Sequence, residues 1–130
     1  DEKVLIALRP EKGFLGNLWE FPGGKLQSGE TLKSCCAREI FEETGLEVRV
    51  SEKLMSVNHA YTHFKITLHA FHCYHISGTP KPHASQELRW VKIEELSDYA
   101  FPKANKKLIA ELQSKSPSAL ATLELFEEKA

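Results

Sequence analysis

Residues 24–46 read GKLQSGETLKSCCAREIFEETGL, and this stretch decides how the rest of the chain is interpreted. Several of its glutamates recur at helical spacing and lie on one side of a predicted helix: Glu39, Glu42 and Glu43. Apolar residues repeat the same spacing on the opposite side: Ala37, Ile40 and Phe41. The pattern predicts an amphipathic helix with one acidic face and one apolar face.

The acidic face needs a source of positive charge. Like charges one turn apart destabilise an isolated helix by roughly a few tenths of a kcal/mol per pair, so a neutralising divalent cation explains their presence. The candidate ligands are oxygen atoms with no His or Cys among them, which favours Mg²⁺ or Mn²⁺ over Zn²⁺. Because Mg²⁺ commonly shares its coordination shell with substrate phosphates, we expect a phosphorylated small molecule as substrate. The alternative is a solvated, glutamate-rich surface.

The residues that flank this helix are typical of turns and helix caps. Pro22, Gly23 and Gly24 form a run that lets the backbone approach a ligand closely. Residues 28–31, Ser-Gly-Glu-Thr, supply turn and capping chemistry ahead of the helix, and Gly45 suits a left-handed stop after it. The sequence therefore predicts a loop, a helix and a second loop.

The spacing of the charged residues is specific. From Gly24 there are five residues to Glu30, then seven to the Arg38-Glu39 pair, and the glutamates, Gly45 and Leu46 follow in fixed order. This arrangement resembles the Nudix box at every defined position, which a solvated acidic surface does not explain. The resemblance implies an α/β fold, namely the Nudix α/β/α sandwich with a mixed sheet.

The resemblance also implies roles for individual residues. The metal would be held by carboxylates and one backbone carbonyl: Gly24, Glu39, Glu42, Glu43 and Glu87. Arg38 would orient Glu39, and Glu30 would tie the loop to the helix. The reaction is attack of water on a phosphorus of a nucleoside diphosphate linked to a further group, with Mg²⁺ as cofactor and Mn²⁺ as a substitute. Glu39 is the expected general base and Glu87 its rival, although Glu87 could equally be a solvated surface carboxylate.

Two further segments resemble the MutT branch of the family, which cleaves oxidised purine nucleoside triphosphates. They are residues 18–25, LWEFPGGK, and residues 101–105, FPKAN. This likeness implies hydrolysis of 8-oxo-dGTP to the monophosphate and pyrophosphate, with these substrate contacts: Arg9, Phe21, Lys25 and Asn105. The amide of Asn105 offers both a donor and an acceptor, as a purine edge demands. The alternative role of Asn105 is to cap the helix that follows.

Two other functions remain open from the sequence. Residues 59–65, HAYTHFK, also resemble the C-terminal domain of MutY-type adenine glycosylases, which reads 8-oxoguanine in DNA without hydrolysing nucleotides. The chain begins at Asp1 rather than Met, which would suit a domain cut from such a fusion. Those domains typically lack the full set of box carboxylates, so an enzyme is favoured. A Nudix hydrolase of nucleotide sugars or dinucleotides is the third possibility.

Composition fits one globular catalytic domain over residues 1–130, with the box at 24–46. The chain is 42% hydrophobic and 27% charged, with a net charge of -1, so we expect no stable nucleic-acid binding outside a MutY-type fusion. Three cysteines form no visible disulfide or zinc pattern, which predicts a cytoplasmic protein. No apolar run is long enough to cross a membrane, so we predict no association with a membrane. Oligomeric state is not indicated.

Periodicity predicts strands and helices in alternation. Strands are expected at residues 4–9, 54–61, 64–76 and 88–93, the third with one apolar face: Phe64, Ile66, Leu68, Ala70 and Tyr74. Beyond the box helix, a helix is expected at residues 103–114. Pro117 is placed to open a last helical pattern, so residues 117–130 are expected to form a helical tail.

Overall fold

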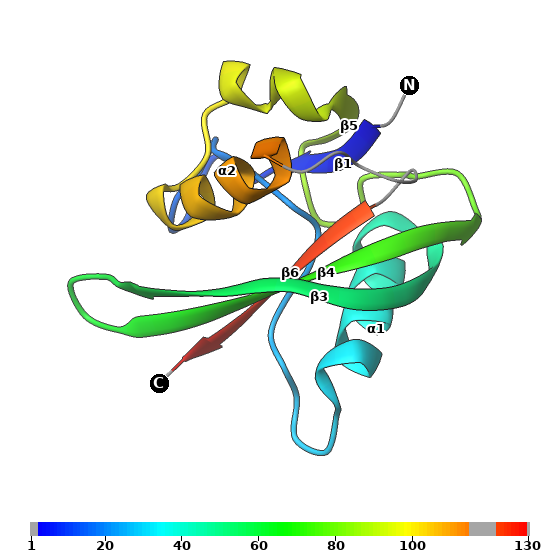
Figure 1. Ribbon diagram of the computed structural model, residues 1–130, viewed down its shortest axis with the longest axis horizontal. Coiled ribbons are helices and arrows are strands. Elements are labelled where there is room, and N and C mark those ends of the chain that lie inside the picture. Colours follow the sequence, from blue (N-terminus) through cyan, green and yellow to red (C-terminus); the bar gives the residue numbers. More distant parts are fainter. Residues whose placement is uncertain (1–2, 115–121, 130) are drawn as a thin grey trace.

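The centre of the structure is a strand that is buried on both faces. The computed structural model describes residues 3–114 and 122–129 (Figure 1). In β1 (Lys3–Leu8), the consecutive side chains of Val4, Leu5, Ile6 and Ala7 are at most 1% exposed. Val4 and Ile6 pack into one hydrophobic core and Leu5 into a second core on the other side. The alternation of a β-strand thus divides Val4, Leu5 and Ile6 between two cores.

The first sheet has the order β2-β1-β5 and is antiparallel. The strand β5 (Glu87–Lys92) pairs along the whole of β1, and β2 (Trp19–Glu20) pairs with its end. The predictions of strands at residues 4–9 and 88–93 are confirmed. The sequence did not predict β2, because two residues are too few to show a periodicity.

The second sheet is built on a long hairpin. The strands β3 (Glu47–Ala60) and β4 (Lys65–Ser77) are antiparallel, so the predictions at residues 54–61 and 64–76 are confirmed, although β3 starts earlier than expected. Burial changes face along β4. Ile66, Leu68 and Ala70 are buried on one face, whereas Phe71 and Cys73 are buried on the other, where they pack with the box helix. The predicted apolar face therefore ends at Ala70, and Tyr74 lies beyond it.

The expected C-terminal helix is wrong for residues 122–129. They form β6 (Thr122–Lys129), which pairs antiparallel with β4, and residues 117–121 lie outside the described part of the chain. The sequence Thr-Leu-Glu-Leu at 122–125 alternates polar and apolar residues, which suits a strand better than a helix. A strand has only two edges, and β3 and β6 occupy those of β4.

The α/β class is confirmed, but the sheets differ from the mixed sheet that we expected. All strand pairs between the described residues are antiparallel and form two three-stranded sheets. Figure 1 shows the β3–β4 hairpin crossing the molecule, with α1 (Leu32–Thr44) on one side and α2 (Lys106–Ser114) with β1 and β5 on the other. Two short 3₁₀ helices, η1 (Ile93–Asp98) and η2 (Lys103–Asn105), lead from β5 into α2. The predicted helix at residues 103–114 therefore begins with a 3₁₀ turn.

The box helix α1 has the predicted ends but a different buried face. The side chains of Thr31 and Ser34 form a reciprocal capping box, and Gly45 adopts the left-handed conformation at φ 77°. The buried residues of α1 are Cys35, Cys36, Ile40 and Thr44. The predicted apolar face is wrong for Phe41, whose exposed fraction is 58%. The helix is rotated so that its cysteines, rather than Phe41, fill the core against Phe71 and Cys73.

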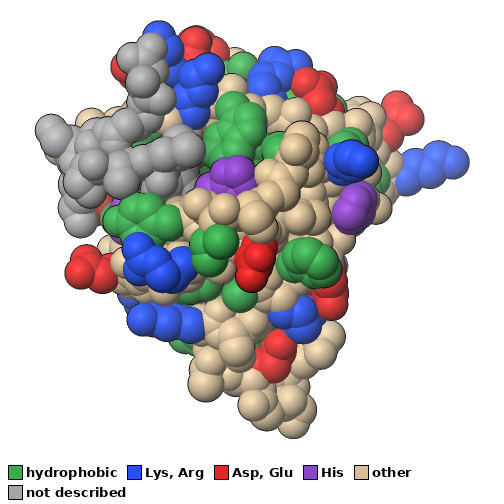
Figure 2. Space-filling model, turned by 90° about the vertical axis from the view of Figure 1, so that its right-hand side faces the viewer, with side chains coloured by type: hydrophobic (Ala, Val, Ile, Leu, Met, Phe, Trp, Pro, Cys, Tyr) green, Lys and Arg blue, Asp and Glu red, His purple; other side chains and the backbone are tan. Residues whose placement is uncertain are grey.

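One face of the molecule is shown in Figure 2, where acidic and basic side chains are interspersed over the coloured residues rather than gathered by sign. The prediction about nucleic acid stays a prediction. None of the helices in the described ranges is long and apolar enough to pass through a membrane.

We expect Gly45→Ala to destabilise the fold by about 1–2 kcal/mol, because an L-residue in the left-handed region places its Cβ against the following carbonyl. Urea unfolding monitored by circular dichroism measures this difference. Lys33→Ala, at an exposed position of the same helix, is the control and should change stability little. Equal stability of both variants would contradict the role of Gly45 as the helix stop.

Candidate active site

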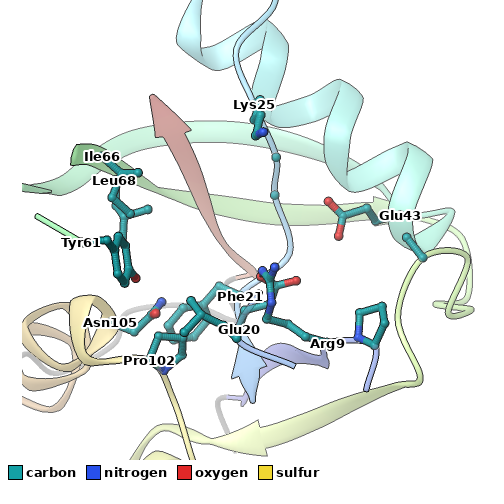
Figure 3. A pocket seen from close by; sticks show the side chains of 15 residues that line it. Arg9, Glu20, Phe21, Lys25, Glu43, Tyr61, Ile66, Leu68, Pro102 and Asn105 are labelled. Carbon is teal, nitrogen blue, oxygen red and sulfur yellow. The ribbon is translucent and has the colours of Figure 1, made fainter. Parts of the chain in front are cut away.

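A pocket of about 300 Å³ opens between the box helix, the loop before it, β4 and η2. Its residues divide into two groups (Figure 3). One end, which we call the acidic end, is lined by Arg9, Glu20, Gly23, Gly24 and Glu43. The other end, which we call the apolar end, is lined by Phe21, Tyr61, Ile66, Leu68, Pro102 and Asn105. A cavity of this size with charge at one end suits a ligand that is itself charged at one end.

Glu43 is the carboxylate that the fold holds most unfavourably. Burial is the main cause, and the nearby charges of Glu20 and Glu39 the next, of a pKa of about 8 for Glu43, while a backbone hydrogen bond from Gly23 acts in the opposite direction. The charged form of Glu43 is therefore disfavoured as long as no cation is present. Such a perturbed carboxylate in a pocket is typical of functional sites.

Glu39 lies against the glycine run. One of its carboxylate oxygens, Oε2, accepts a hydrogen bond from the Lys25 N–H at 3.2 Å. The approach to Gly24 is so close that a Cβ built there would be 1.8 Å from Glu39 Oε2. Burial raises the pKa of Glu39, and Arg38 opposes this shift. The absence of a side chain at Gly24 is thus what lets a glutamate of α1 reach the loop backbone.

Arg38 holds the loop to the helix. Its Nε and Nη2 donate to both carboxylate oxygens of Glu30, at 2.5 and 2.9 Å, and this pairing lowers the pKa of Glu30 to about 2. The prediction that Glu30 ties the loop to the helix is confirmed. Arg38 Nη1 also donates to Glu42 Oε1 at 3.0 Å and lies 3.6 Å from Glu39 Oε1. One guanidinium therefore contacts three of the box glutamates.

Arg9 and Glu20 form an ion pair at the acidic end, with 2.6 Å between Arg9 Nη1 and Glu20 Oε1. Arg9 was predicted as a substrate contact, and the structure places it in the pocket. Glu20 was not predicted, although it stands in the quoted segment 18–25. A single glutamate in a two-residue strand carries no periodic signal, so only its position beside the glycine run could have drawn attention to it.

Glu87 is not brought to the pocket. Its carboxylate pairs with Arg89, with 2.9 Å between Glu87 Oε2 and Arg89 Nε, and it does not line the cavity. The placement gives no support to Glu87 as a metal ligand or as the rival general base. Phe21 and Lys25 do line the cavity, and the ring of Phe21 stacks on Phe101 at 5.4 Å between centroids.

Asn105 is a buried polar side chain that lines the apolar end. Its exposed fraction is 4%, and its backbone N–H bonds to the carbonyl of Pro102 at 3.0 Å. The described residues offer its side-chain amide no hydrogen-bond partner, so no capping bond to the following helix is formed. A buried amide without a partner among these residues is costly, and it is available to bond a ligand in the pocket.

The donor set fits a hard divalent cation. Glu39, Glu42, Glu43 and the Gly24 carbonyl provide only oxygen atoms. Burial, and after it the negative charges of Glu20 and Glu39, raises the pKa of Glu43. Within residues 3–114 and 122–129, no three His, Cys, Asp or Glu side chains already surround a common point. Glu42 instead turns to Arg38, and Glu39 to the Lys25 N–H, as mutual repulsion would require without a cation.

Comparison with known proteins agrees with the site. A family model described as NUDIX domain matches residues 1–111. The chain belongs to the Nudix family. It is similar to the CTP pyrophosphohydrolase of Escherichia coli K12, at 36% identity over 109 residues, which cover 84% of this chain and 81% of that protein. It is also similar to the putative 8-oxo-dGTP diphosphatase 2 of Mycobacterium tuberculosis, at 35% identity over 116 residues, which cover 84% and 78% of the two chains.

A solved structure has the same fold. The crystal structure of the MutT protein from Methanosarcina mazei Go1 matches with a TM-score of 0.76 and 26% identity, covering 85% of this chain and 82% of that one. The chain is thus a MutT-like Nudix pyrophosphohydrolase, and the predicted enzyme class is confirmed. Nudix hydrolases generally use a divalent metal, in agreement with the oxygen donors of the box.

We expect the metal-free protein to lose stability as the pH rises from about 5 to 8. The pKa of Glu43 is about 8 in the folded state, against 4.5 for an unperturbed glutamate, so the folded state binds the extra proton in that interval. The free energy of unfolding then falls by up to about 1.4 kcal/mol per pH unit.

Urea unfolding at several pH values in the presence of EDTA measures this slope. Glu43→Gln is the matched variant, because it keeps the shape but cannot ionise, and it should flatten the slope. A divalent cation should flatten it in the unmodified chain. An equal slope in the two proteins would contradict the assignment of Glu43 as the strained carboxylate.

Proposed function

We propose that the chain hydrolyses a nucleoside triphosphate to the monophosphate and pyrophosphate with Mg²⁺, and that its substrates are oxidised purine nucleotides such as 8-oxo-dGTP. The observation that carries this proposal is the side-chain amide of Asn105 at the apolar end of the pocket, which is buried and has no hydrogen-bond partner among the described residues. A base edge that both donates and accepts would satisfy it. The acidic end would then face the phosphate chain.

The residues that would hold the ion are Glu39, Glu42, Glu43 and the carbonyl of Gly24, with Mn²⁺ able to replace Mg²⁺. A bound divalent ion supplies charge neutralisation for the phosphate oxygens and for the leaving group. Glu39 is our choice of general base, because burial already raises its pKa and it lies beside the glycine run. Arg38 would orient Glu39 across the 3.6 Å between their charged groups.

The other pocket residues would bind the substrate. The Arg9 guanidinium and the Lys25 side chain are the cations along the cavity, so they would contact phosphate oxygens. The Phe21 ring, held by its stack on Phe101, would provide an apolar floor for the base. All these contacts would be made to a small-molecule nucleotide.

A second substrate class has a specific observation in its favour. The relative that matches at 36% identity is named a CTP pyrophosphohydrolase, and the amide of Asn105 can also pair with a pyrimidine edge. Cytidine triphosphate is therefore the alternative substrate. Passive recognition of 8-oxoguanine, as in MutY-type domains, is not supported by the hydrolase names of these relatives.

Two further proposals concern the chain as a whole. The pairing of β6 with β4 supports one domain over residues 1–130. The three cysteines of the sequence show no disulfide framework or zinc pattern in their spacing, which supports a reducing, cytoplasmic location.

A substrate panel with Mg²⁺ tests the proposed activity. We expect 8-oxo-dGTP to have the highest kcat/KM among 8-oxo-dGTP, dGTP, CTP, ADP-ribose and a diadenosine polyphosphate, with pyrophosphate as product. A preference for CTP would select the alternative substrate. A preference for ADP-ribose or for the diadenosine polyphosphate would contradict both proposed substrates, 8-oxo-dGTP and CTP.

We expect Asn105→Ala to reduce discrimination between 8-oxo-dGTP and dGTP by roughly 5- to 150-fold, because a base-edge hydrogen bond worth about 1–3 kcal/mol is lost. Stability should not fall, since the described residues give the amide no bond to lose. The ratio of kcat/KM values and a urea melt measure these two quantities. Unchanged discrimination with lower stability would show that Asn105 has a structural role instead.

A further inference from the structure

Phe14 is an exposed phenylalanine that nevertheless packs against other rings. Its exposed fraction is 51%, and it lies in the loop between β1 and β2. Its ring meets Tyr61 edge-on, with centroids 5.0 Å apart and an interplanar angle of 81°, and it also contacts Phe64 at 5.4 Å. Tyr61 and Phe64 belong to the tip of the β3–β4 hairpin, so Phe14 joins two segments that are distant in sequence.

The loop that carries Phe14 is held in a strained conformation. Leu15 and Asn17 adopt positive φ angles of 58° and 62°, which L-residues rarely do. The side chain of Gln86 holds this shape, because its Nε2 donates to Asn17 Oδ1 and to the Arg9 carbonyl, each at 2.7 Å. Backbone strain persists only where surrounding contacts enforce it, and it concentrates at functional sites. The loop therefore fixes the position of Phe14.

Phe14 also contacts the acidic end of the pocket through its main chain. Its carbonyl accepts a hydrogen bond from Arg9 Nε at 3.3 Å, while Arg9 Nη1 pairs with Glu20. Arg9 and Tyr61 both line the cavity at opposite ends, whereas Phe14 does not line it (Figure 3). One residue outside the cavity thus contacts a side chain at each of its ends.

We propose that Phe14 is a positioning residue that couples Arg9 at the acidic end to Tyr61 at the apolar end. Its carbonyl directs the guanidinium and its ring directs the tyrosine, so both ends are arranged before a nucleotide enters. A ligand with a base and a phosphate chain gains from both, and this adds a determinant of nucleotide affinity beyond Asn105. The inference rests on the proposed function, in which a nucleotide fills this pocket.

Calorimetric binding of the α,β-methylene analogues of 8-oxo-dGTP and CTP to the full chain tests the proposal. We expect Phe14→Leu to raise Kd roughly 3- to 10-fold, the range of an edge-to-face aromatic contact. Phe14→Tyr keeps the ring and should restore Kd. Ile76→Ala is the control, because Ile76 is also more than half exposed, at 58%, and lies outside the cavity.

Two double variants separate coupling from a general packing effect. In a Tyr61→Leu background, Phe14→Leu should change Kd less than 2-fold, because its partner is already absent. Phe14→Leu keeps the backbone carbonyl to which Arg9 bonds, so the acidic end is tested by Arg9→Lys, which keeps the charge but removes the Nε–H. If loss of the Phe14 ring also disturbs Arg9, Arg9→Lys should likewise reduce the effect of Phe14→Leu on Kd.

Independent, multiplying effects in both double variants would overturn the coupling, and so would equal Kd values for Phe14→Leu and Ile76→Ala. If the unmodified chain binds neither analogue, the proposed function fails and this inference fails with it. Binding by the unmodified chain without any difference among the variants would overturn the coupling alone.

Discussion

The structure depends on the repulsion between carboxylates that the fold places close together. Glu43 of the box helix and Glu20 of β2 line the same pocket, and burial, followed by the charges of Glu20 and Glu39, raises the pKa of Glu43. Burial also raises the pKa of Glu39 on the same helix. The helix cannot relieve this by moving, because it is capped at both ends and its cysteine face is fixed in a core with β4. Only the side chains can turn away, as Glu39 does toward the Lys25 N–H. A bound divalent cation would offset the electrostatic cost of placing these carboxylates close together.

The same fold separates the two tasks of the pocket. The acidic end comes from the box helix, β2 and the end of β1, whereas the apolar end comes from β4, the hairpin tip and η2. These elements meet because β1 contributes side chains to both cores and β4 changes its buried face at Ala70. The backbone N–H of Trp19 further ties the box loop to the segment before η2, because it donates to the Ala100 carbonyl at 2.8 Å. The acidic end and the apolar end of the pocket are thus held at a fixed separation.

Much of this could be predicted from the sequence, and the failures have physical causes. The box helix and its stop at Gly45 follow from local spacing and are confirmed. Glu30 ties the loop to the helix through Arg38, as the family resemblance implied. The exposure of Phe41 depends on which face the cysteines occupy, and β6 depends on a free edge of β4, so neither is encoded locally. Glu20 and Tyr61 reach the pocket only through tertiary packing, and Glu87 is drawn to Arg89 by a charge two residues away. Local sequence spacing predicts the box helix, whereas contacts between residues distant in sequence determine which side chains line the pocket.

The central claim is that Glu43 carries a proton until a divalent ion displaces it. Titration of Mn²⁺ into the chain at pH 7, by calorimetry in two buffers of different ionisation enthalpy, counts the protons released on binding. With the pKa of Glu43 at about 8, we predict release of about one proton per ion by the unmodified chain and loss of that release in Glu43→Gln. Absence of Mn²⁺ binding, or equal proton release by the two proteins, would contradict the account.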